Sequence, residues 1–381
     1  MNRSVLLETF HSSREIADRG TVTVATSWSH PQRGPVTCPA HPLLTASAGH
    51  AGFNTVTRAL TTRDLRHRLR PGPSAASTVF AASYENPTGG VVGFAVAAHP
   101  ADRHALAFAR EEVAAWRTVL RTRRLLHTSH PHSAPHTERQ SAAAALPSQG
   151  RDGRPFRWRA CGCPVTTACP AVDNAVSTIQ RFQSRGDEVV LIGRSPLGPL
   201  PLPPTLLQAP PGLTVCETAD QAETLTLTNP GALAFVMAPG AVTSQTTRIL
   251  AILRRRFPRL RGQHPDQWCY TATDLHDAAR SVMAESDVLL VVGQGHSPAS
   301  TVLSAEAVRA GIPVHRIESL TVLRPQHIDA STVALVEAEA TPPTCTTLSG
   351  LLAGLGPWST IHRELVSRVT THTPATHPAN R

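Results

Sequence analysis

The residues best suited to chemistry in this sequence are two cysteines that precede helical stretches. Cys169 lies in the segment TTACPAV, and Cys269 lies in DQWCYTAT. The field at a helix N-terminus lowers the pKa of a thiol and favours the thiolate, which is the form that binds metals. Two thiolates on equivalent loops of α/β units are suitable ligands for an iron–sulfur cluster or for zinc. The competing interpretation is structural, because a free cysteine is often a small buried core residue.

The remaining cysteines fall in different settings. Cys38 lies in a Pro-broken loop after a predicted strand, which makes it a third ligand candidate. Cys161 and Cys163 form a C-x-C step that either adds ligands to a cluster or lies idle in a loop. Cys216 and Cys345 are predicted to be structural thiols. In a reducing compartment the 7 cysteines are expected to be thiols or metal ligands and not disulfides.

A second candidate site is the glycine-containing turn VVGQGHSPAST at residues 291–301. Backbone amides at the following helix start, with the hydroxyls of Ser297 and Ser300, predict a place for a phosphate group. The same residues are what an ordinary helix cap requires, so capping is the alternative. The turn lacks the G-x-G-x-x-G pattern of dinucleotide sites, and the chain has neither a P-loop nor a G-x-S-x-G elbow.

An alternation of strands and helices positions these residues. Beyond residue 158 the pattern predicts an α/β fold with parallel sheets, in which ligands bind where the strands end. Apolar runs predict strands at 188–192, 213–216, 232–236, 287–292, 313–317 and 332–336. Helical spacing predicts helices at 172–184, 243–256, 273–284, 299–310 and 343–355.

The first part of the chain, residues 1–126, predicts a separate small α/β unit. TVTVAT at 21–26 is a predicted strand, and STVFAAS and GGVVGFAVAAHP are two more. Helical spacing at Val56, Leu60, Leu65 and Leu69 predicts a helix between the first two strands. Residues 101–126 are predicted to form one extended helix that ends the unit.

A linker and further units follow. Residues 127–157 are rich in His, Pro and Ser and poor in apolar side chains, which predicts disorder. Units are then expected at 158–265 and 266–357, with a tail at 358–381. Histidines of the linker either bind a transition metal or, as the composition favours, form a solvated tract: His127, His130, His132 and His136.

The composition argues against nucleic-acid and membrane partners. All 36 basic residues are arginine, and the formal net charge of +9 would suit a polyanion. The arginines are spread along the chain, however, and the group Arg254, Arg255 and Arg256 ends a predicted helix, where cations complement the dipole. No apolar run is long enough for a membrane span, and no signal peptide is predicted. A cytoplasmic protein is expected.

Taken together, these blocks resemble the 4-hydroxy-3-methylbut-2-enyl diphosphate reductase family, also called LytB, over about residues 165–355. CPAVDNAVSTIQRFQSRGDEVVLIG is similar to the block around that family's second cysteine, roughly CPLVTKVHKEV followed by a GEIILIG strand. DQWCYTATDLHDAARSV is similar to the block of its third cysteine, and the distance from Cys169 to Cys269 is similar too. SDVLLVVGQGHSPASTVL resembles the family's VVGSxNSSNS segment.

The resemblance implies three small α/β units with mostly parallel sheets, in a pseudo-threefold arrangement around a central [4Fe–4S] cluster. It implies Cys169, Cys269 and, as the nearest counterpart of the first cysteine, Cys38 as metal ligands. Ser297 and Ser300 are implied to bind substrate. The implied activity is reductive removal of a hydroxyl from a small diphosphate in isoprenoid biosynthesis. The implied partners are that diphosphate and an electron donor such as ferredoxin or flavodoxin.

The chain departs from the family at several site positions. The family's proton-relaying glutamate follows the LIG strand in GHxxHPEVxGT, where this chain has IGRSPLGPLPLPPTLL, without His or carboxylate. The family's TQTTLS stretch is replaced by MAPGAV at residues 237–242. The Asn of its SSNS segment is missing at residues 297–300, and its phosphate-binding Ser falls near Ala340 or Thr341.

Two hypotheses follow from these departures. Loss of a general acid costs about 100- to 10,000-fold in rate, and no residue of this sequence is predicted to take its place. The first hypothesis is an iron–sulfur oxidoreductase of this family with an altered substrate site. The second is a catalytically inactive homologue that acts as a regulatory or partner protein.

Overall fold

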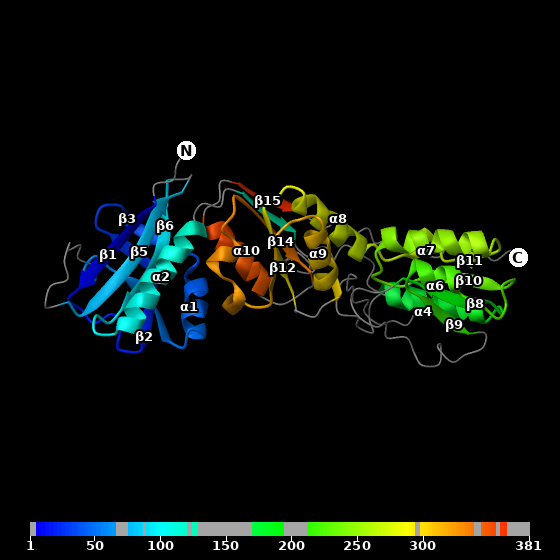
Figure 1. Ribbon diagram of the computed structural model, residues 1–381, viewed down its shortest axis with the longest axis horizontal. Helices are drawn as coiled ribbons and strands as arrows, with labels where there is room; N and C mark the ends of the chain where they lie inside the picture. Colours follow the sequence, from blue (N-terminus) through cyan, green and yellow to red (C-terminus); the bar gives the residue numbers. More distant parts are fainter. Residues whose placement is uncertain are drawn as a thin grey trace, which may run out of the picture. The chain divides into compact units, whose positions relative to one another are not determined.

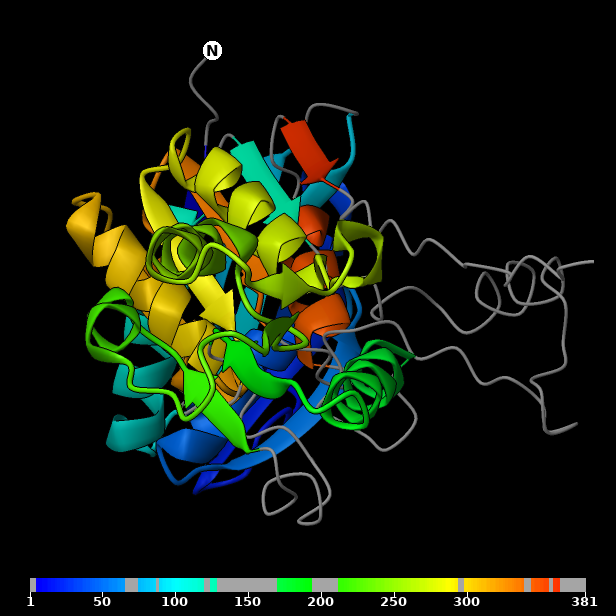
Figure 2. The same cartoon turned by 90° about the vertical axis from the view of Figure 1, so that its right-hand side faces the viewer.

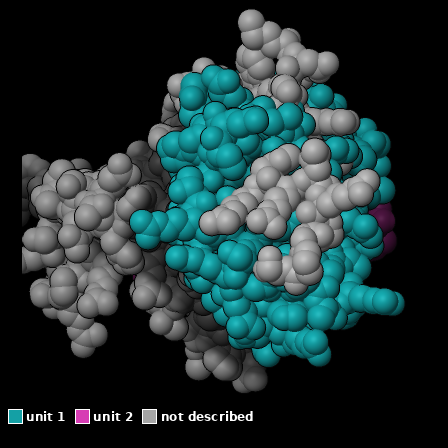
Figure 3. Space-filling model, turned by 90° about the vertical axis from the view of Figure 1, so that its left-hand side faces the viewer, with its two compact units in different colours: residues 1–128, 280–296, 303–363 teal, residues 129–279, 297–302, 364–381 magenta. Residues whose placement is uncertain are grey.

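The computed structural model of the protein describes residues 5–65, 75–86, 89–119, 124–128, 170–193, 212–293, 298–338, 344–355 and 359–363. These residues form three sheets with flanking helices, which confirms the α/β class. The chain divides into two compact units, coloured separately in Figure 3. Unit 1 comprises residues 1–128, 280–296 and 303–363, and unit 2 comprises residues 129–279, 297–302 and 364–381.

A six-stranded sheet begins unit 1 (Figure 1), with its strands in the order β1-β5-β6-β3-β2-β4. This sheet is mainly antiparallel, and only the pairs β2 with β4 and β3 with β6 are parallel. The strands predicted around 21–26 and in STVFAAS and GGVVGFAVAAHP are confirmed. The strands are β1 (Leu6–Ser12), β2 (Thr21–His30), β3 (Gly34–Thr37), β4 (Asn54–Leu60), β5 (Ser77–Glu85) and β6 (Val91–Ala98).

Two helices, α1 (His41–His50) and α2 (Arg103–Val119), pack on one face of this sheet. The helix predicted from Val56 and Leu60 is wrong, because both residues belong to β4, which pairs with β2. The hydrogen bonds of that pairing join segments far apart in sequence. Local spacing of apolar residues gives no information about such partners.

The second sheet of unit 1 has five strands, all parallel, in the order β13-β12-β14-β7-β15. The strands predicted at 287–292, 313–317 and 332–336 are confirmed as β12, β13 and β14. The strands are β7 (Arg124–Thr128), β12 (Val288–Val292), β13 (Val314–Ile317), β14 (Thr332–Glu337) and β15 (Ser359–Arg363).

Strands β7 and β15 correct three predictions. The helix predicted over 101–126 ends at Val119, and Leu125 and Leu126 lie in β7, 2% exposed, between β14 and β15. His127 therefore belongs to a paired strand and not to a disordered linker. β15 likewise lies inside the predicted tail, 358–381. The rest of the predicted linker lies outside the described residues.

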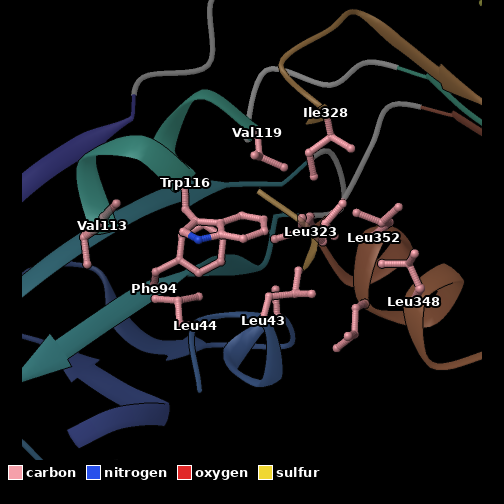
Figure 4. Packing of buried hydrophobic residues seen from close by; sticks show 14 of the residues in the cluster. Leu43, Leu44, Phe94, Val113, Trp116, Val119, Leu323, Ile328, Leu348 and Leu352 are labelled. Atoms are coloured by element: carbon pink, nitrogen blue, oxygen red, sulfur yellow. The ribbon is translucent and has the colours of Figure 1, made fainter. Parts of the chain in front are cut away.

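The two sheets of unit 1 share one hydrophobic core (Figure 4). Trp116 of α2 is fully buried at its centre, 0% exposed. Burial of apolar surface stabilises the folded state by about 25 cal/mol per Å². The shared core therefore holds the six-stranded sheet to the rest of unit 1. Other members come from α1, from the short helices η2 (Leu320–Val322) and η3 (Pro325–His327) with their flanks, and from α10 (Thr344–Gly354): Leu43, Leu323, Ile328, Leu348 and Leu352.

Unit 2 contains a four-stranded parallel sheet in the order β11-β10-β8-β9. Helix α4 (Pro170–Gln183) packs on one face, and α6 (Ala219–Thr224) and α7 (Thr243–Arg256) pack on the other. Figures 1 and 2 show α4 and α7 on opposite sides of the sheet. These elements confirm the predicted pattern. The strands are β8 (Glu188–Ile192), β9 (Leu213–Cys216), β10 (Leu233–Met237) and β11 (Arg261–Gly262).

Three further helices complete the described part of the chain. They are η1 (Pro265–Gln267), α8 (Thr271–Met283) and α9 (Pro298–Arg309). Helices α8 and α9 confirm the predictions at 273–284 and 299–310, and α10 confirms the one at 343–355.

The arginine group at the end of α7 binds its neighbour α6. Arg255 forms an ion pair with Glu223 at 2.6 Å. Arg256 donates hydrogen bonds to the backbone carbonyls of Ala222 and Leu225. These carbonyls end a helix and have no partner within it, so the arginine satisfies groups that would otherwise need water.

Candidate metal centre

The carboxyl edge of the four-stranded sheet gathers the starts of two helices. Helix α7 follows β10 through the turn 238–242, so its N-terminus lies at this edge. Helix α4 is joined to β8 by the short turn 184–187 and packs on β8 and β10, so its start at Pro170 lies toward the same edge. Ligands of parallel sheets bind at this edge. Unpaired amides at helix N-termini favour a thiolate or a phosphate there.

The segment that carries Cys269 is tied to the same edge. Gln263, which follows β11, accepts a hydrogen bond from the Met237 amide at 3.1 Å and donates one to the Gln267 carbonyl at 3.3 Å. Helix η1 within this segment packs against α4. Cys269 is partly exposed and lies between η1 and the start of α8. Its thiol forms no disulfide with another described residue.

Helices α7 and α8 are joined at their first turns by two threonines. The Thr243 amide donates to Thr273 Oγ1 at 2.9 Å, and the Thr273 hydroxyl donates to Thr243 Oγ1 at 2.9 Å. Thr273 thereby caps α7, whose preceding residue, Val242, carries no capping group. Because the Thr273 proton is directed to Thr243, the Thr243 hydroxyl keeps its own proton for a further acceptor.

Gly193 allows the end of β8 to approach α7 closely. Its φ is +96°, which favours glycine, and a Cβ at this position would lie 2.4 Å from Thr246 Cγ2. A larger residue would push the first turn of α7 away from the sheet. The close approach therefore depends on this glycine.

Asp173 is a carboxyl group that the sequence analysis missed. It lies in the first turn of α4, and Cys169, which lies outside the described residues, is bonded to Pro170 at the start of that helix. The Asp173 side chain is largely exposed, but partial desolvation raises the pKa of its carboxyl above 3.8. It therefore keeps a proton to higher pH than an ordinary aspartate. An acidic residue at a helix start was the available signal, although it is also common for stability alone.

Cys38 lies in unit 1 and has a different setting. It is 2% exposed within an apolar cluster on the six-stranded sheet. Burial raises the pKa of its thiol to about 12, against the opposing effects of hydrogen bonds from the Ala95 backbone and Trp28. A protonated thiol among apolar side chains is the usual setting of a structural cysteine. Burial also raises the pKa of Cys216, as expected of a structural thiol.

The predicted phosphate-binding turn is described only in part. Ser297 lies outside the described residues, and Ser300 lies in the first turn of α9, 1% exposed. Residues 297–302 belong to unit 2, as does Cys269. The Ser300 hydroxyl is thus enclosed by protein, which agrees with the capping alternative as well as with a buried ligand contact.

The turn before α7 is apolar and buried. Met237, Ala238, Ala241 and Val242 are 5%, 3%, 4% and 6% exposed. Met237 packs into the core on one face of the sheet, and Ala238 and Ala241 pack into the core on the other face. This turn offers a ligand no hydroxyl side chain, so a phosphate at the edge would depend on backbone amides and on Thr243.

The donor chemistry at the edge fits an iron–sulfur cluster in part. Within the described ranges, no group of three or more His, Cys, Asp or Glu is placed to hold a metal ion. Cys269 is a partly exposed thiol before a helix start, and Cys169 has the same place in sequence before α4, so both suit thiolate ligands. In the same described ranges, no helix has the length and apolarity needed to cross a membrane.

A second group of titratable side chains lies at the carboxyl edge of the five-stranded sheet. Glu337, 1% exposed at the end of β14, lies 3.2 Å from His127 Nε2 on β7. The ring of His362 on β15 lies beside that of His127, with centroids 4.9 Å apart and the ring planes inclined by 34°. The sequence analysis missed this group because it assigned His127 to a disordered linker and His362 to a C-terminal tail. The signal was a glutamate directly after an apolar strand.

The comparison with protein-family models identifies the family of this chain. The model of the LytB protein matches residues 157–348, half of the chain. The chain belongs to the LytB family. The resemblance drawn from the two cysteine blocks is confirmed. The matched residues include Cys161, Cys163, Cys169 and Cys269, whereas Cys38 and the whole six-stranded sheet lie outside them.

Individual relatives agree with the family. A "4-hydroxy-3-methylbut-2-enyl diphosphate reductase" of Chromohalobacter salexigens is 30% identical over 177 residues, 46% of this chain and 56% of that protein. One of Bradyrhizobium diazoefficiens is 36% identical over 155 residues, 39% of this chain and 46% of that protein. The chain thus spans about half the length of the curated relatives it matches. A solved structure of the reductase from Plasmodium falciparum has a TM-score of 0.45 and 18% identity, over 67% of this chain and 74% of that chain.

Proposed function

We propose that this LytB-family chain binds a [4Fe–4S] cluster through Cys169 and Cys269 and reduces a small allylic diphosphate. The observation that carries the proposal is that the start of α4, the start of α7 and the Cys269 segment meet at one sheet edge of unit 2. Helix N-termini stabilise both thiolates and phosphates, so one edge suits both ligands. The names of the relatives, which are diphosphate reductases, support the activity.

The proposed ligand set differs from the one first implied by the resemblance. Cys38 is a buried, protonated thiol outside the family match, so we assign the third thiolate to Cys161 or Cys163. Both lie a few residues before Cys169 in the matched part of the chain. A bound cluster would supply electrons to the substrate, received from a ferredoxin or flavodoxin.

The remaining steps rest on protein side chains. The Thr243 hydroxyl binds a phosphate oxygen at the N-terminus of α7, where the helix dipole favours an anion. The Asp173 carboxyl, whose pKa partial desolvation raises, holds the proton that leaves with the substrate hydroxyl as water. Asp173 thus replaces the proton-relaying glutamate of the family, which this chain lacks in the segment after β8. Two electrons and a second proton, taken from solvent, form the C–H bond that replaces the broken C–O bond. Closure of the sheet edge by the apolar turn 238–242 limits access of water.

Iron and sulfide content tests the cluster. Protein purified without oxygen, or reconstituted with iron and sulfide, is expected to absorb near about 400 nm. Cys169→Ala and Cys269→Ala should lose iron, and Cys38→Ala should keep it as the matched control. A colourless wild-type protein without iron would overturn the proposal. Loss of iron in Cys38→Ala with retained folding would overturn the ligand assignment.

Turnover tests the reaction separately. Cluster-loaded protein with a low-potential electron donor is expected to convert 4-hydroxy-3-methylbut-2-enyl diphosphate or a related allylic diphosphate. Asp173→Asn should keep its iron and lose about 100-fold or more in rate, as removal of a general acid does. Equal turnover in Asp173→Asn would remove Asp173 from this role.

A second function is favoured by one observation, the apolar and buried turn before α7. This turn cannot give a diphosphate the hydroxyl contacts that the resemblance leads one to expect. The chain would then be a non-catalytic homologue with a regulatory or partner role. Absence of turnover by protein with a full cluster, tested with several allylic diphosphates, would support this function over the first.

A further inference from the structure

Two stacked histidines connect the segment 320–328 to the five-stranded sheet of unit 1. His315 lies on β13 and His327 ends η3, and their rings are parallel within 20° with centroids 4.3 Å apart. The His327 Nδ1 accepts a hydrogen bond from the Arg324 amide at 3.2 Å. An acceptor nitrogen carries no proton, so the neutral ring has its proton on Nε2. The stack therefore contains a neutral His327 ring.

The segment held by this stack joins the two sheets of unit 1. Residues 320–328, which include η2 and η3, contact α1 and α2 of the six-stranded sheet. Leu323 and Ile328, 1% and 0% exposed, enter the shared core beside Leu43 and Leu352, as Figure 4 shows. Displacement of this segment would therefore open the core that attaches α1 and α2.

The charged groups around the stack oppose protonation. Arg324 acts on His327, and each ring would repel the other once both carry charge. Desolvation lowers the pKa of His315, and it lowers that of His327 together with the charges of His315 and Arg324. Arg316 on β13 is engaged with Ser304, and Glu112 of α2 is engaged with Trp116. Glu318 and Asp329 flank the segment in exposed positions.

We propose that the His315–His327 stack is a pH-sensitive clasp that releases residues 320–328 from β13 in acid and so loosens α1 and α2. Protonation of His327 Nδ1 removes the acceptor of the Arg324 amide and places two imidazolium rings against each other. Opening the segment gives the charged rings access to water. The proposal concerns unit 1 alone and does not depend on the cluster or on turnover.

Hydrogen–deuterium exchange of the full chain tests the clasp at about pH 7.5 and at steps down to about pH 4.5, because the pKa values of both rings lie below the ordinary histidine value. After correction for intrinsic exchange rates, residues 320–328 and the facing turns of α1 and α2 are expected to lose protection in acid. Residues of β10 and α7 in unit 2 serve as an internal reference and should keep theirs. Unchanged protection of 320–328 in acid would overturn the proposal.

Variants separate the clasp from general acid sensitivity. His327→Asn keeps an acceptor for the Arg324 amide, and His315→Phe keeps a ring for stacking, but neither side chain can take up a proton. The double variant should keep its protection at the lower pH, whereas His50→Gln, at the exposed last residue of α1, should behave as wild type. A double variant that loses as much protection as wild type would refute the clasp.

Should the double variant fail to fold, the wild-type protein still gives a decision. NMR titration of its histidine ring protons is expected to show two rings that protonate together below the ordinary range, at the pH where 320–328 opens. Titration at the ordinary value without any change in those amides would rule the proposal out.

Discussion

The Thr243 amide and the Thr273 hydroxyl lie 2.9 Å apart, so the first turn of α8 supplies the cap that α7 lacks. This contact spans 30 positions of sequence and links the helix that follows Cys269 to the helix at the end of β10. The candidate metal centre of unit 2 depends on such contacts between loops.

Substitution of Thr273 is expected to destabilise the edge of the sheet. Thr273→Val keeps the side-chain volume but leaves the Thr243 amide unsatisfied, which should cost about 1 kcal/mol in the free energy of unfolding. Chemical denaturation measures this loss. Thr247→Val is the matched control, since the exposed Thr247 hydroxyl donates only within its own helix, to the Thr243 carbonyl at 2.7 Å. Equal stability of the two variants would show that Thr273 is no cap.

Truncation of Trp116 should separate the two sheets of unit 1. The side chain is 0% exposed in the shared core, so Trp116→Ala is expected to cost about 3 to 5 kcal/mol, enough to unfold unit 1 partly or wholly. Thermal unfolding followed by circular dichroism checks this result. Val322→Ala removes a side chain that is 42% exposed in the segment nearby and should change stability by about 0.5 kcal/mol or less. A mild effect of Trp116→Ala would mean that the six-stranded sheet is only loosely attached.

Alkylation should distinguish Cys38 from Cys269. With a thiol pKa of about 12, Cys38 is a thiolate in only about one molecule in ten thousand near pH 8, and it is also shielded from reagents. Cluster-free protein treated with iodoacetamide and analysed by mass spectrometry should carry the label at Cys269 well before Cys38. Protein unfolded in guanidinium should label both at similar rates. Fast labelling of native Cys38 would contradict the assignment of this residue to the core.

Asp102 should make the stability of unit 1 depend on pH in acid. Hydrogen bonds from the amides of Ala105 and then Gly20 lower the pKa of its carboxyl below 3.8. The stabilising effect is therefore complete above the unfolded value of 3.8 and disappears as the pH falls through the lower folded value. Asp102→Ala should cost about 1 kcal/mol at neutral pH, as loss of a helix cap does.

The pH dependence of this difference supplies the check. Urea unfolding at a series of pH values should show the wild type and Asp102→Ala converging below about pH 4. Asp277→Ala, at an exposed position of α8, should run parallel to wild type over the same series. A constant gap between wild type and Asp102→Ala down to low pH would argue against a carboxylate cap.

Much of the C-terminal fold could be predicted from the sequence. Strands β8, β10, β12 and β14 are continuous apolar runs, and the helices between them carry clear helical spacing. In a parallel sheet covered on both faces, local sequence reports burial directly. The blocks around Cys169 and Cys269 likewise indicate the family from sequence alone.

Other features depended on partners that are distant in sequence. β4, β7 and β15 are short strands whose hydrogen bonds come from β2 and β14 or from each other, so nothing local separates them from a helix or a tail. The burial of Cys38 could not be predicted from the sequence either, because this loop cysteine is enclosed only when distant strands of the six-stranded sheet pack around it.

The sequence by itself determined the family, the α/β order from residue 170 onward and the two cysteines at helix starts. Only the tertiary structure decided which side chains meet, namely Thr243 with Thr273, His127 with Glu337 and His315 with His327. The physical reason is that periodicity reflects the face an element buries, whereas a site reflects which loop ends the packing of separate elements brings together.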